Sequence, residues 1–188
     1  MKTRSASDLG WRSATSLDDL GELTARWLLG DIPAIPGQAG RPDLETAEIR
    51  DALVTLNRGG LVTTMSQPQA AGTGWRQRAA VTGLASADVA RRLETACRRA
   101  GLGVGVVSPG ERHRWHRDSS RAATVGEIRG SVSVLVGAVE STHALRLLWG
   151  PHLSRSGLAV VLGACEVFAY DPEWTRSGLL WDTLTRAI

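Results

Sequence analysis

The chain has 188 residues, of which 43% are hydrophobic and 22% charged, and its formal net charge is +3. These values fit one globular domain and exclude an intrinsically disordered chain. The N-terminal segment MKTRSASDLGWRSATS lacks the apolar stretch of a signal peptide, and no apolar run approaches the length of a membrane span. We therefore expect a cytoplasmic protein without membrane contact. Residues 1–15 are expected to be a flexible lead-in, and residues 16–188 a single domain.

Three amphipathic helices are predicted in the first hundred residues, because apolar side chains recur there at three- and four-residue spacing. The proline- and glycine-rich segment 31–42 predicts an irregular connection between the first two helices. Ser, Asp and Gly mark the helix ends, as is typical of N-caps and C-terminal stops. The helices begin after Ser16, Asp43 and Ser86 and end at Gly30, Gly59 and Gly101.

Strand-like segments alternate with these helices. Residues 61–67 and 75–84 show a two-residue period and predict a strand pair joined by the loop 69–74. In the first strand the alternation places Thr63 with Met65 on one face and Thr64 with Ser66 on the other. The remainder predicts strands at 102–108, within 123–137 and at 166–171, and helices at 142–149, 154–165 and 178–188. The expected fold class is α+β, with mixed sheets flanked by helices in one domain.

Glycines and cysteines give no sign of a cofactor site. The run Gly101-x-Gly103-x-Gly105 lies inside a strand-like segment rather than before a helix, so we interpret these glycines as points of close packing and not as a dinucleotide loop. Cys97 and Cys165 lie in apolar surroundings far apart in sequence, which favours two buried thiols over a disulfide or a zinc site.

The segment 111–121, ERHRWHRDSSR, gathers basic residues around Trp115. Such a segment is either a solvated loop or a contact site for phosphate or another polyanion, although we do not expect nucleic acid to be the partner. His113 and His116 lack a third ligand nearby, so no metal site is predicted. The chain has no G-x-S-x-G elbow, and the spacing of its carboxylates selects no acid–base pair. Catalytic residues therefore stay unassigned, and the sequence does not decide whether the protein is an enzyme.

Small polar residues gather along the predicted strand pair, beside Pro68 and Trp75. They line either a pocket for a polar ligand or the solvent-facing side of a hairpin. The residues are Thr63, Thr64, Ser66, Gln67 and Gln77.

The same region carries a resemblance to a known family. The motifs are Glu45-Thr46, a helix, Leu56-Asn57-Arg58-x-Gly60, Leu61-x-Thr63-x-x-Ser66-Gln67-Pro68, then Gly74 and Gln77-Arg78-Ala79. This order resembles the C-terminal regulatory domain of eukaryotic methylenetetrahydrofolate reductase, which has an ET-helix-N-x-x-G-x-L-T-x-x-SQP block followed by a QKA-type strand. The likeness spans nearly the whole chain but is weak between about residues 105 and 155. The chain also resembles a family of small uncharacterised proteins from high-GC bacteria.

In the reductase this domain binds S-adenosylmethionine or S-adenosylhomocysteine, so the resemblance implies the same ligands here. It implies no folate reduction and no flavin, because the catalytic barrel has no counterpart in this chain, and it implies a homodimer. The ligand-binding residues that it implies are Thr63, Ser66, Gln67, Pro68, Gln77 and Thr82. Thr82 stands where the family has a glutamate, so a carboxylate that could pair with the ligand's ammonium group is missing.

Three functions follow as hypotheses. The first is a stand-alone small-molecule-binding domain for S-adenosylmethionine or S-adenosylhomocysteine. The second is a small S-adenosylmethionine-dependent transferase of specialised metabolism, which a second cavity of substrate size beside the first would favour. The third is a ligand-free interaction protein that contacts a polyanion or a protein through the loop 111–121.

Overall fold

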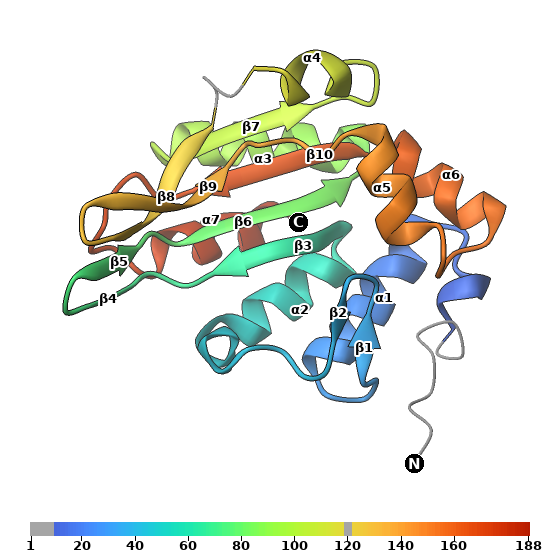
Figure 1. Ribbon diagram of the computed structural model, residues 1–188, viewed down its shortest axis with the longest axis horizontal. Coiled ribbons are helices and arrows are strands. Elements are labelled where there is room, and N and C mark those ends of the chain that lie inside the picture. The colour runs from blue at the N-terminus through green and yellow to red at the C-terminus, as the bar shows by residue number, and fades with distance from the viewer. Residues whose placement is uncertain (1–9, 119–121) are drawn as a thin grey trace.

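A four-stranded antiparallel sheet forms the centre of the domain in the computed structural model, which describes residues 10–118 and 122–188 (Figure 1). Its strand order is β3-β6-β10-β7, and every neighbouring pair is antiparallel. The strands are β3 (Leu61–Gln67), β6 (Ala80–Ala85), β7 (Gly103–Val107) and β10 (Cys165–Tyr170). The expected α+β class is confirmed.

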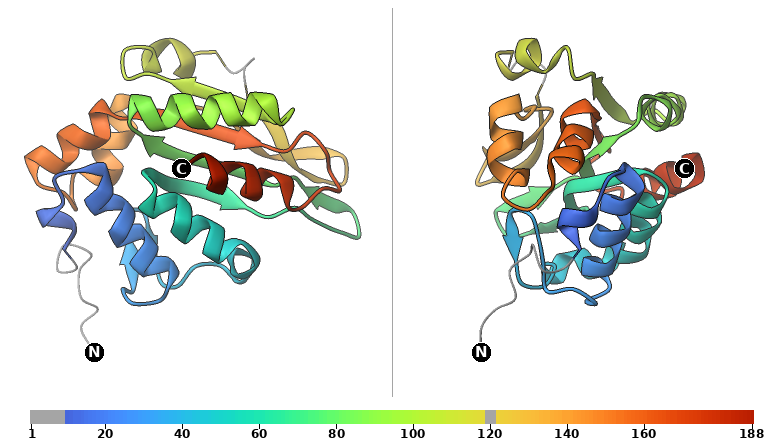
Figure 2. Two further views of the ribbon diagram at one scale, coloured as in Figure 1. Left: turned by 180° about the vertical axis from the view of Figure 1, so that it is seen from behind. Right: turned by 90° about the vertical axis from the view of Figure 1, so that its right-hand side faces the viewer.

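Helices cover one face of this sheet, as seen from behind in Figure 2. Three of them, α2 (Arg50–Arg58), α3 (Ala87–Arg99) and α7 (Leu179–Ala187), pack on that face. The fourth, α1 (Leu17–Leu28), packs beside α2 at the edge strand β3. Trp27 of α1 and Trp181 of α7 are both buried in the main core. This core also buries Cys97 and Cys165, and both thiols are free, as predicted.

A second antiparallel sheet lies against the opposite face and adjoins a smaller core. Its strand order is β4-β5-β8-β9, with β4 (Ala70–Gly72), β5 (Trp75–Gln77), β8 (Ala123–Ile128) and β9 (Ser131–Val136). The helices α4 (Arg112–His116), α5 (Thr142–Trp149) and α6 (Arg155–Gly163) complete the domain. Residues that alternate along β10 divide between the two cores: Val167 and Ala169 join the main core, and Phe168 joins the smaller one.

The single strand expected at 75–84 is wrong, because the chain changes sheets within it. Residues 75–77 form β5, the backbone N–H of Arg78 donates to the Val125 carbonyl oxygen of β8, and β6 then begins at Ala80. The side-chain amide of Gln67 donates to the carbonyl oxygens of Arg78 and Val125, both at 2.9 Å, and so fills the gap between the sheets. Part of the expected loop 69–74 is strand β4.

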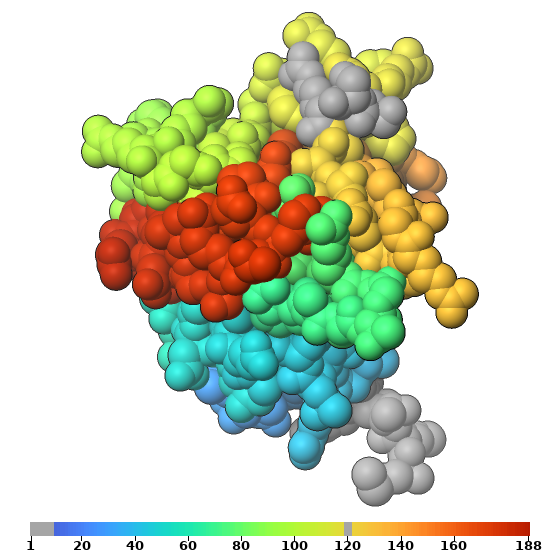
Figure 3. All heavy atoms as spheres, turned by 90° about the vertical axis from the view of Figure 1, so that its left-hand side faces the viewer, coloured from blue at the N-terminus to red at the C-terminus, as the bar shows by residue number. Residues whose placement is uncertain are grey.

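The β4–β5 hairpin packs against the segment that follows β10 (Figure 3). The guanidinium carbons of Arg76 and Arg78 lie 4.1 and 4.0 Å from the ring centre of Trp174. Arg78 is half-buried, and stacking of this kind is favourable because the aromatic face attracts cations. The contact holds the second sheet to the C-terminal part of the chain.

The N-terminal boundary of the domain differs from the expected flexible lead-in over residues 1–15. Residues 10–15 belong to the packed domain: Trp11, in the short 3₁₀ helix η2 (Trp11–Ser13), is fully buried and meets Trp149 edge-on at 6.2 Å between ring centres. The large apolar area of an indole favours burial over exposure. Residues 1–9 lie outside the described residues.

The helix ends follow the sequence closely, with one exception. Ser16 and Asp19 form a reciprocal capping box at the start of α1, and the Ser86 hydroxyl accepts from the Val89 N–H. The helix expected after Asp43 instead begins with the 3₁₀ helix η3 (Leu44–Ile49), and its first bond is an i→i+3 bond from the Thr46 N–H to the Asp43 carbonyl oxygen. The irregular connection before it contains a short hairpin of β1 (Ala34–Ile35) and β2 (Gln38–Ala39).

The glycines of β7 serve close packing, as the sequence indicates. A methyl group on Gly103 would lie 2.2 Å from the Tyr170 ring, and one on Gly105 would lie 2.2 Å from the Phe168 ring. The two rings of β10 therefore lie directly over the neighbouring strand.

Candidate functional site

A pocket of about 180 Å³ lies on the helix side of β3, between α1, the β1–β2 hairpin and η3. Its apolar walls include Trp27 and Ile35. The indole N–H of Trp27 donates to the Gly40 carbonyl oxygen at 2.7 Å, which fixes the ring. The polar lining residues are Gln38, Asp43, Thr46, Thr63, Thr64 and Ser66.

A β-bulge in β3 shapes this pocket. Thr63 pairs with Gly83, Met65 with Thr82 and Ser66 with Val81, so the register shifts by one residue at Thr64. An extra residue in one strand reverses the faces of all residues beyond it. Thr63 and Ser66 therefore share the helix-facing side, whereas simple alternation predicts opposite sides.

A buried asparagine positions the Thr63 hydroxyl. Asn57, at the end of α2, donates from its side-chain amide to the Leu53 carbonyl oxygen and to the Thr63 hydroxyl oxygen, each at 2.8 Å. The side-chain oxygen Oδ1 of Asn57 accepts the Thr63 backbone N–H at 3.0 Å. The Thr63 hydroxyl oxygen is thus occupied as an acceptor, which leaves its O–H as a donor for the pocket.

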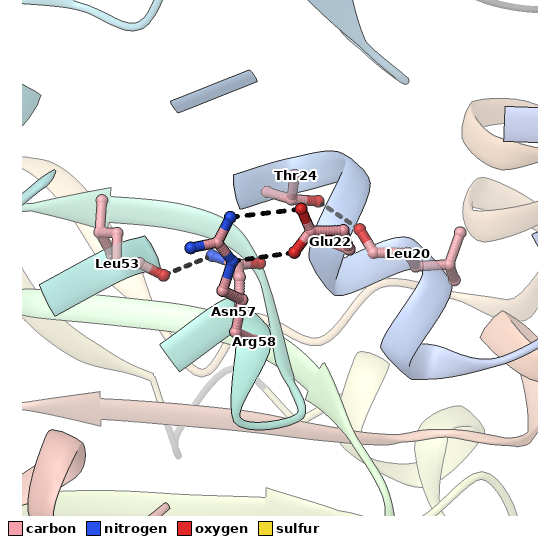
Figure 4. Close-up of polar contacts among 6 residues, drawn as sticks. All are labelled: Leu20, Glu22, Thr24, Leu53, Asn57 and Arg58. Carbon is pink, nitrogen blue, oxygen red and sulfur yellow. Dashed lines mark hydrogen bonds and ion pairs between the residues drawn. The ribbon is translucent and has the colours of Figure 1, made fainter. Parts of the chain in front are cut away.

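The helix that carries Asn57 is itself fixed to α1 (Figure 4). Arg58 donates to both carboxylate oxygens of Glu22, at 2.8 and 3.2 Å. The helices also approach closely at Gly21, where a methyl group would lie 2.1 Å from the Asn57 carbonyl oxygen. Contacts between α1 and α2 thus hold the floor of the pocket, while its β1–β2 wall has two ladder pairs and the hydrogen bond from Trp27 to the Gly40 carbonyl oxygen.

The structure brings only some of the predicted binding residues into this pocket. Of the six, Thr63 and Ser66 line it. Gln67 bridges the two sheets, Pro68 lines a different surface pocket, and the Gln77 amide donates to the Glu45 carboxylate and the Pro68 carbonyl oxygen. Thr82 faces another cavity on the opposite side of the sheet.

Sequence reasoning did not assign Trp27, Gln38, Asp43 and Thr46 to the site. Thr46 carried a usable signal, because Glu45-Thr46 is part of the motif order behind the family resemblance. The other three come from segments that only the tertiary structure brings to β3.

A second pocket of about 330 Å³ adjoins the first, because Thr64 and Met65 line both. Thr82, Glu140 and Glu166 also line it. Glu166 is 5% exposed, and its burial raises the pKa of the carboxyl group to about 7, against smaller lowering effects from the Glu140 backbone N–H and the Arg112 charge. Its Oε2 atom has no hydrogen-bond partner in the described part of the chain.

The described part of the basic segment 111–121 is largely exposed to solvent, but it forms a short helix instead of a loop. Residues 112–116 form α4, and Arg112 is only 1% exposed. Its guanidinium donates to the carbonyl oxygens of Leu162, at 2.6 Å, and Ala164 at the end of α6. Arg112 therefore cannot contact a polyanion, while His113, Arg114 and Arg117 stay exposed. Residues 119–121 lie outside the described residues.

Within residues 10–118 and 122–188, no helix has the length and apolar character needed to cross a membrane. No group of three or more His, Cys, Asp or Glu side chains in the same ranges could hold a metal ion.

Comparison with known proteins places the chain in a family by sequence. The chain belongs to the family described as "Domain of unknown function (DUF6919)", which matches residues 6–188. The match thus includes the whole α+β fold and both pockets. No curated protein matches the chain.

Proposed function

We propose that the chain is a stand-alone small-molecule-binding domain whose ligand, S-adenosylmethionine or S-adenosylhomocysteine, occupies the pocket beside β3. One observation carries this proposal: Thr46, Thr63 and Ser66, all from the motif order that resembles the reductase regulatory domain, line a single pocket. The proposal includes neither folate reduction nor flavin binding.

The chemistry of the lining supports such a ligand. Its hydroxyl groups and the Gln38 amide can donate to and accept from ribose hydroxyls, while Trp27 and Ile35 offer apolar surface to a base. Asp43 supplies the carboxylate that is missing at Thr82, and it can pair with the ammonium group of the ligand.

The pocket volume sets a condition on binding. Its 180 Å³ is below the range of about 300–1,000 Å³ that is typical of ligand pockets. A whole nucleoside therefore requires outward movement of the β1–β2 hairpin, which has two ladder pairs and is tied to α1 by the hydrogen bond from Trp27 to Gly40. Binding should protect the hairpin amides from hydrogen exchange.

Calorimetric titration with each of the two ligands tests the proposal. Ser66→Ala and Thr46→Val should each weaken binding by about three- to tenfold, the effect of one lost hydrogen bond. Ser156→Ala on the exposed side of α6 is the matched control and should bind as the unmodified chain does. Absence of binding to either ligand at millimolar concentration would refute the proposal.

A second candidate function is a small S-adenosylmethionine-dependent transferase. The second pocket favours it, because a cavity of 330 Å³ is large enough for a small substrate and shares Thr64 and Met65 with the first. Incubation of the protein with S-adenosylmethionine and candidate acceptors, followed by mass spectrometry, should then show S-adenosylhomocysteine formation. Binding without turnover would leave the binding domain as the function.

A further inference from the structure

The second pocket combines carboxyl groups with apolar walls. Glu140 and Glu166 line it together with the hydroxyl groups of Thr64 and Thr82. Nearly all other lining side chains are apolar, and no Lys, Arg or His in the described ranges is among them. An anionic ligand would therefore meet two carboxyl groups and no cation in the lining itself.

Strand geometry places Glu166 in this pocket. Glu166 pairs with Leu84 of β6, and Phe168, two residues further on, pairs with Thr82. Residues two apart on a strand share a face, so Glu166, Leu84 and Thr82 all point away from the main helix layer. A carboxyl group thus lies one strand away from Thr82, diagonally across the sheet.

The Glu166 carboxyl group is left short of hydrogen bonds. The Glu140 backbone N–H donates to it, but Oε2 is buried without a partner in the described part of the chain. Arg112, the nearby cation from α4, uses its terminal nitrogens on the carbonyl oxygens of α6. A buried acceptor that lacks a donor is unfavourable, so a ligand that brings a donor to this carboxyl group gains free energy.

We propose that the second pocket binds a small, mostly apolar amine, with its ammonium group on Glu166 and its apolar body against α5. The wall on that side is formed by Leu145, Leu148 and Trp149. Glu140 at the rim adds a second negative charge that attracts the same cation. This inference does not depend on an adenosyl ligand in the first pocket.

The proposal has a pH signature. An ammonium group pairs with the ionised carboxylate, whose pKa is near 7 in the free protein. The charged groups that face Glu166 are Glu140, from the segment before α5, and Arg112 from α4, while Cys165 precedes it on β10. Affinity for an amine should therefore rise about fivefold to tenfold between about pH 6 and pH 8, as Glu166 loses its proton.

The test uses the whole chain and 2-phenylethylamine as the probe, with 2-phenylethanol and 3-phenylpropionate as neutral and anionic controls of similar shape. Titration calorimetry should show binding of 2-phenylethylamine and no binding of either control compound. Glu166→Gln keeps the size of the side chain but removes its charge, and should weaken amine binding by about tenfold or more and abolish its pH dependence. Leu148→Trp places a larger side chain of α5 in the same pocket and should also weaken amine binding. This variant leaves the buried Glu166 carboxyl group unchanged.

Three results would each overturn the proposal. They are equal binding of the amine and the alcohol, unchanged amine binding in Glu166→Gln and Leu148→Trp, and no binding of the amine. Ser66→Ala serves as the matched control, since it lines only the first pocket and should leave amine binding unchanged. Loss of S-adenosylmethionine binding in Ser66→Ala therefore reports on the first pocket, and loss of amine binding in Glu166→Gln reports on the second.

Discussion

A single buried carboxyl group couples the stability of this fold to pH. The pKa of Glu166 is about 7 in the folded chain, against 4.5 for an exposed glutamate. Between these values the folded state binds more protons than the unfolded state, so the free energy of unfolding falls as pH rises. The stabilisation is complete below about pH 4.5 and is lost through pH 7.

Glu166→Gln should remove this dependence. Over the full range the Glu166 contribution is on the order of 3 kcal/mol, since one pKa unit corresponds to about 1.4 kcal/mol. Urea unfolding of the two proteins at about pH 5 and pH 8 measures the difference. The unmodified chain should lose more stability over this interval than the variant does. Parallel losses would show that Glu166 titrates in the folded chain as it does in water.

Gly21 is a second residue whose environment decides the effect of a substitution. A methyl group at this position would lie 2.1 Å from the Asn57 carbonyl oxygen, which is backbone and cannot move aside cheaply. Gly21→Ala should therefore destabilise the domain by roughly 2 kcal/mol or more, through separation of α1 and α2. Gly163→Ala, with nothing within 4 Å of the added methyl group, is the control and should be neutral or slightly stabilising. Thermal unfolding of both variants decides the matter.

Individual elements depend on local signals that are strong in this chain. Ser16 and Asp19 close the capping box of α1, with the Asp19 N–H 3.1 Å from the Ser16 hydroxyl oxygen and the Ser16 N–H 3.0 Å from the Asp19 carboxylate. The Thr15 backbone N–H and the Ser16 hydroxyl, together with the Thr15 hydroxyl and the Ser16 backbone N–H, hold the pKa of Asp19 below its usual value. The first turn of α1 thus satisfies its own donors.

Ser16→Ala should destabilise the chain by about 1 kcal/mol, because the Asp19 N–H loses its acceptor. Ser16→Thr retains a hydroxyl oxygen and should change stability by only a few tenths of that amount. Urea midpoints for the two variants provide the measurement. If Ser16→Ala and Ser16→Thr destabilise the chain by similar amounts, the effect comes from packing around residue 16 and not from the loss of the cap.

At the scale of the whole molecule, Arg112 ties α4 to the end of α6, 50 residues further along the chain. Its three acceptors are the carbonyl oxygens of Val161, Leu162 and Ala164, which end a helix and are otherwise short of donors. The contact joins α4 to the end of α6. Glu166 lies two residues after Ala164, so the contact of Arg112 with the end of α6 also helps to position the carboxyl group of the second pocket.

Arg112→Ala should destabilise the protein by roughly 3 kcal/mol, because it removes a buried cation together with its charge-assisted hydrogen bonds. Arg114→Ala, two residues away on an exposed position, should stay within about 0.5 kcal/mol of the unmodified chain. Equilibrium unfolding compares the two. Equal, small effects would mean that the contact with α6 contributes nothing to stability.

Periodicity and capping residues predict most of the elements. The helices at 17–28 and 87–99 and the strand at 61–67 follow directly from the sequence pattern, and the strands expected at 102–108 and 166–171 differ from β7 and β10 by one residue at each end. Errors occur where long-range contacts decide. The segment 75–84 divides into two strands because its halves pair with different strands. Trp11 is buried because it packs against Trp149, which lies 138 residues further along the chain. Four of the six predicted binding residues lie outside the first pocket for the same reason.

Local sequence patterns suffice to predict the α+β class, most of the helix caps, the buried thiols and the block of polar residues around Thr63, because each depends on neighbours within a few residues. Which of those polar residues share a pocket depends on contacts between distant segments. The bulge at Thr64 turns Ser66 to the side of Thr63, and the pairing of β10 with β6 brings Glu166 close to Thr82. Register and layer packing set these positions, and both arise from contacts between segments that are distant in the chain.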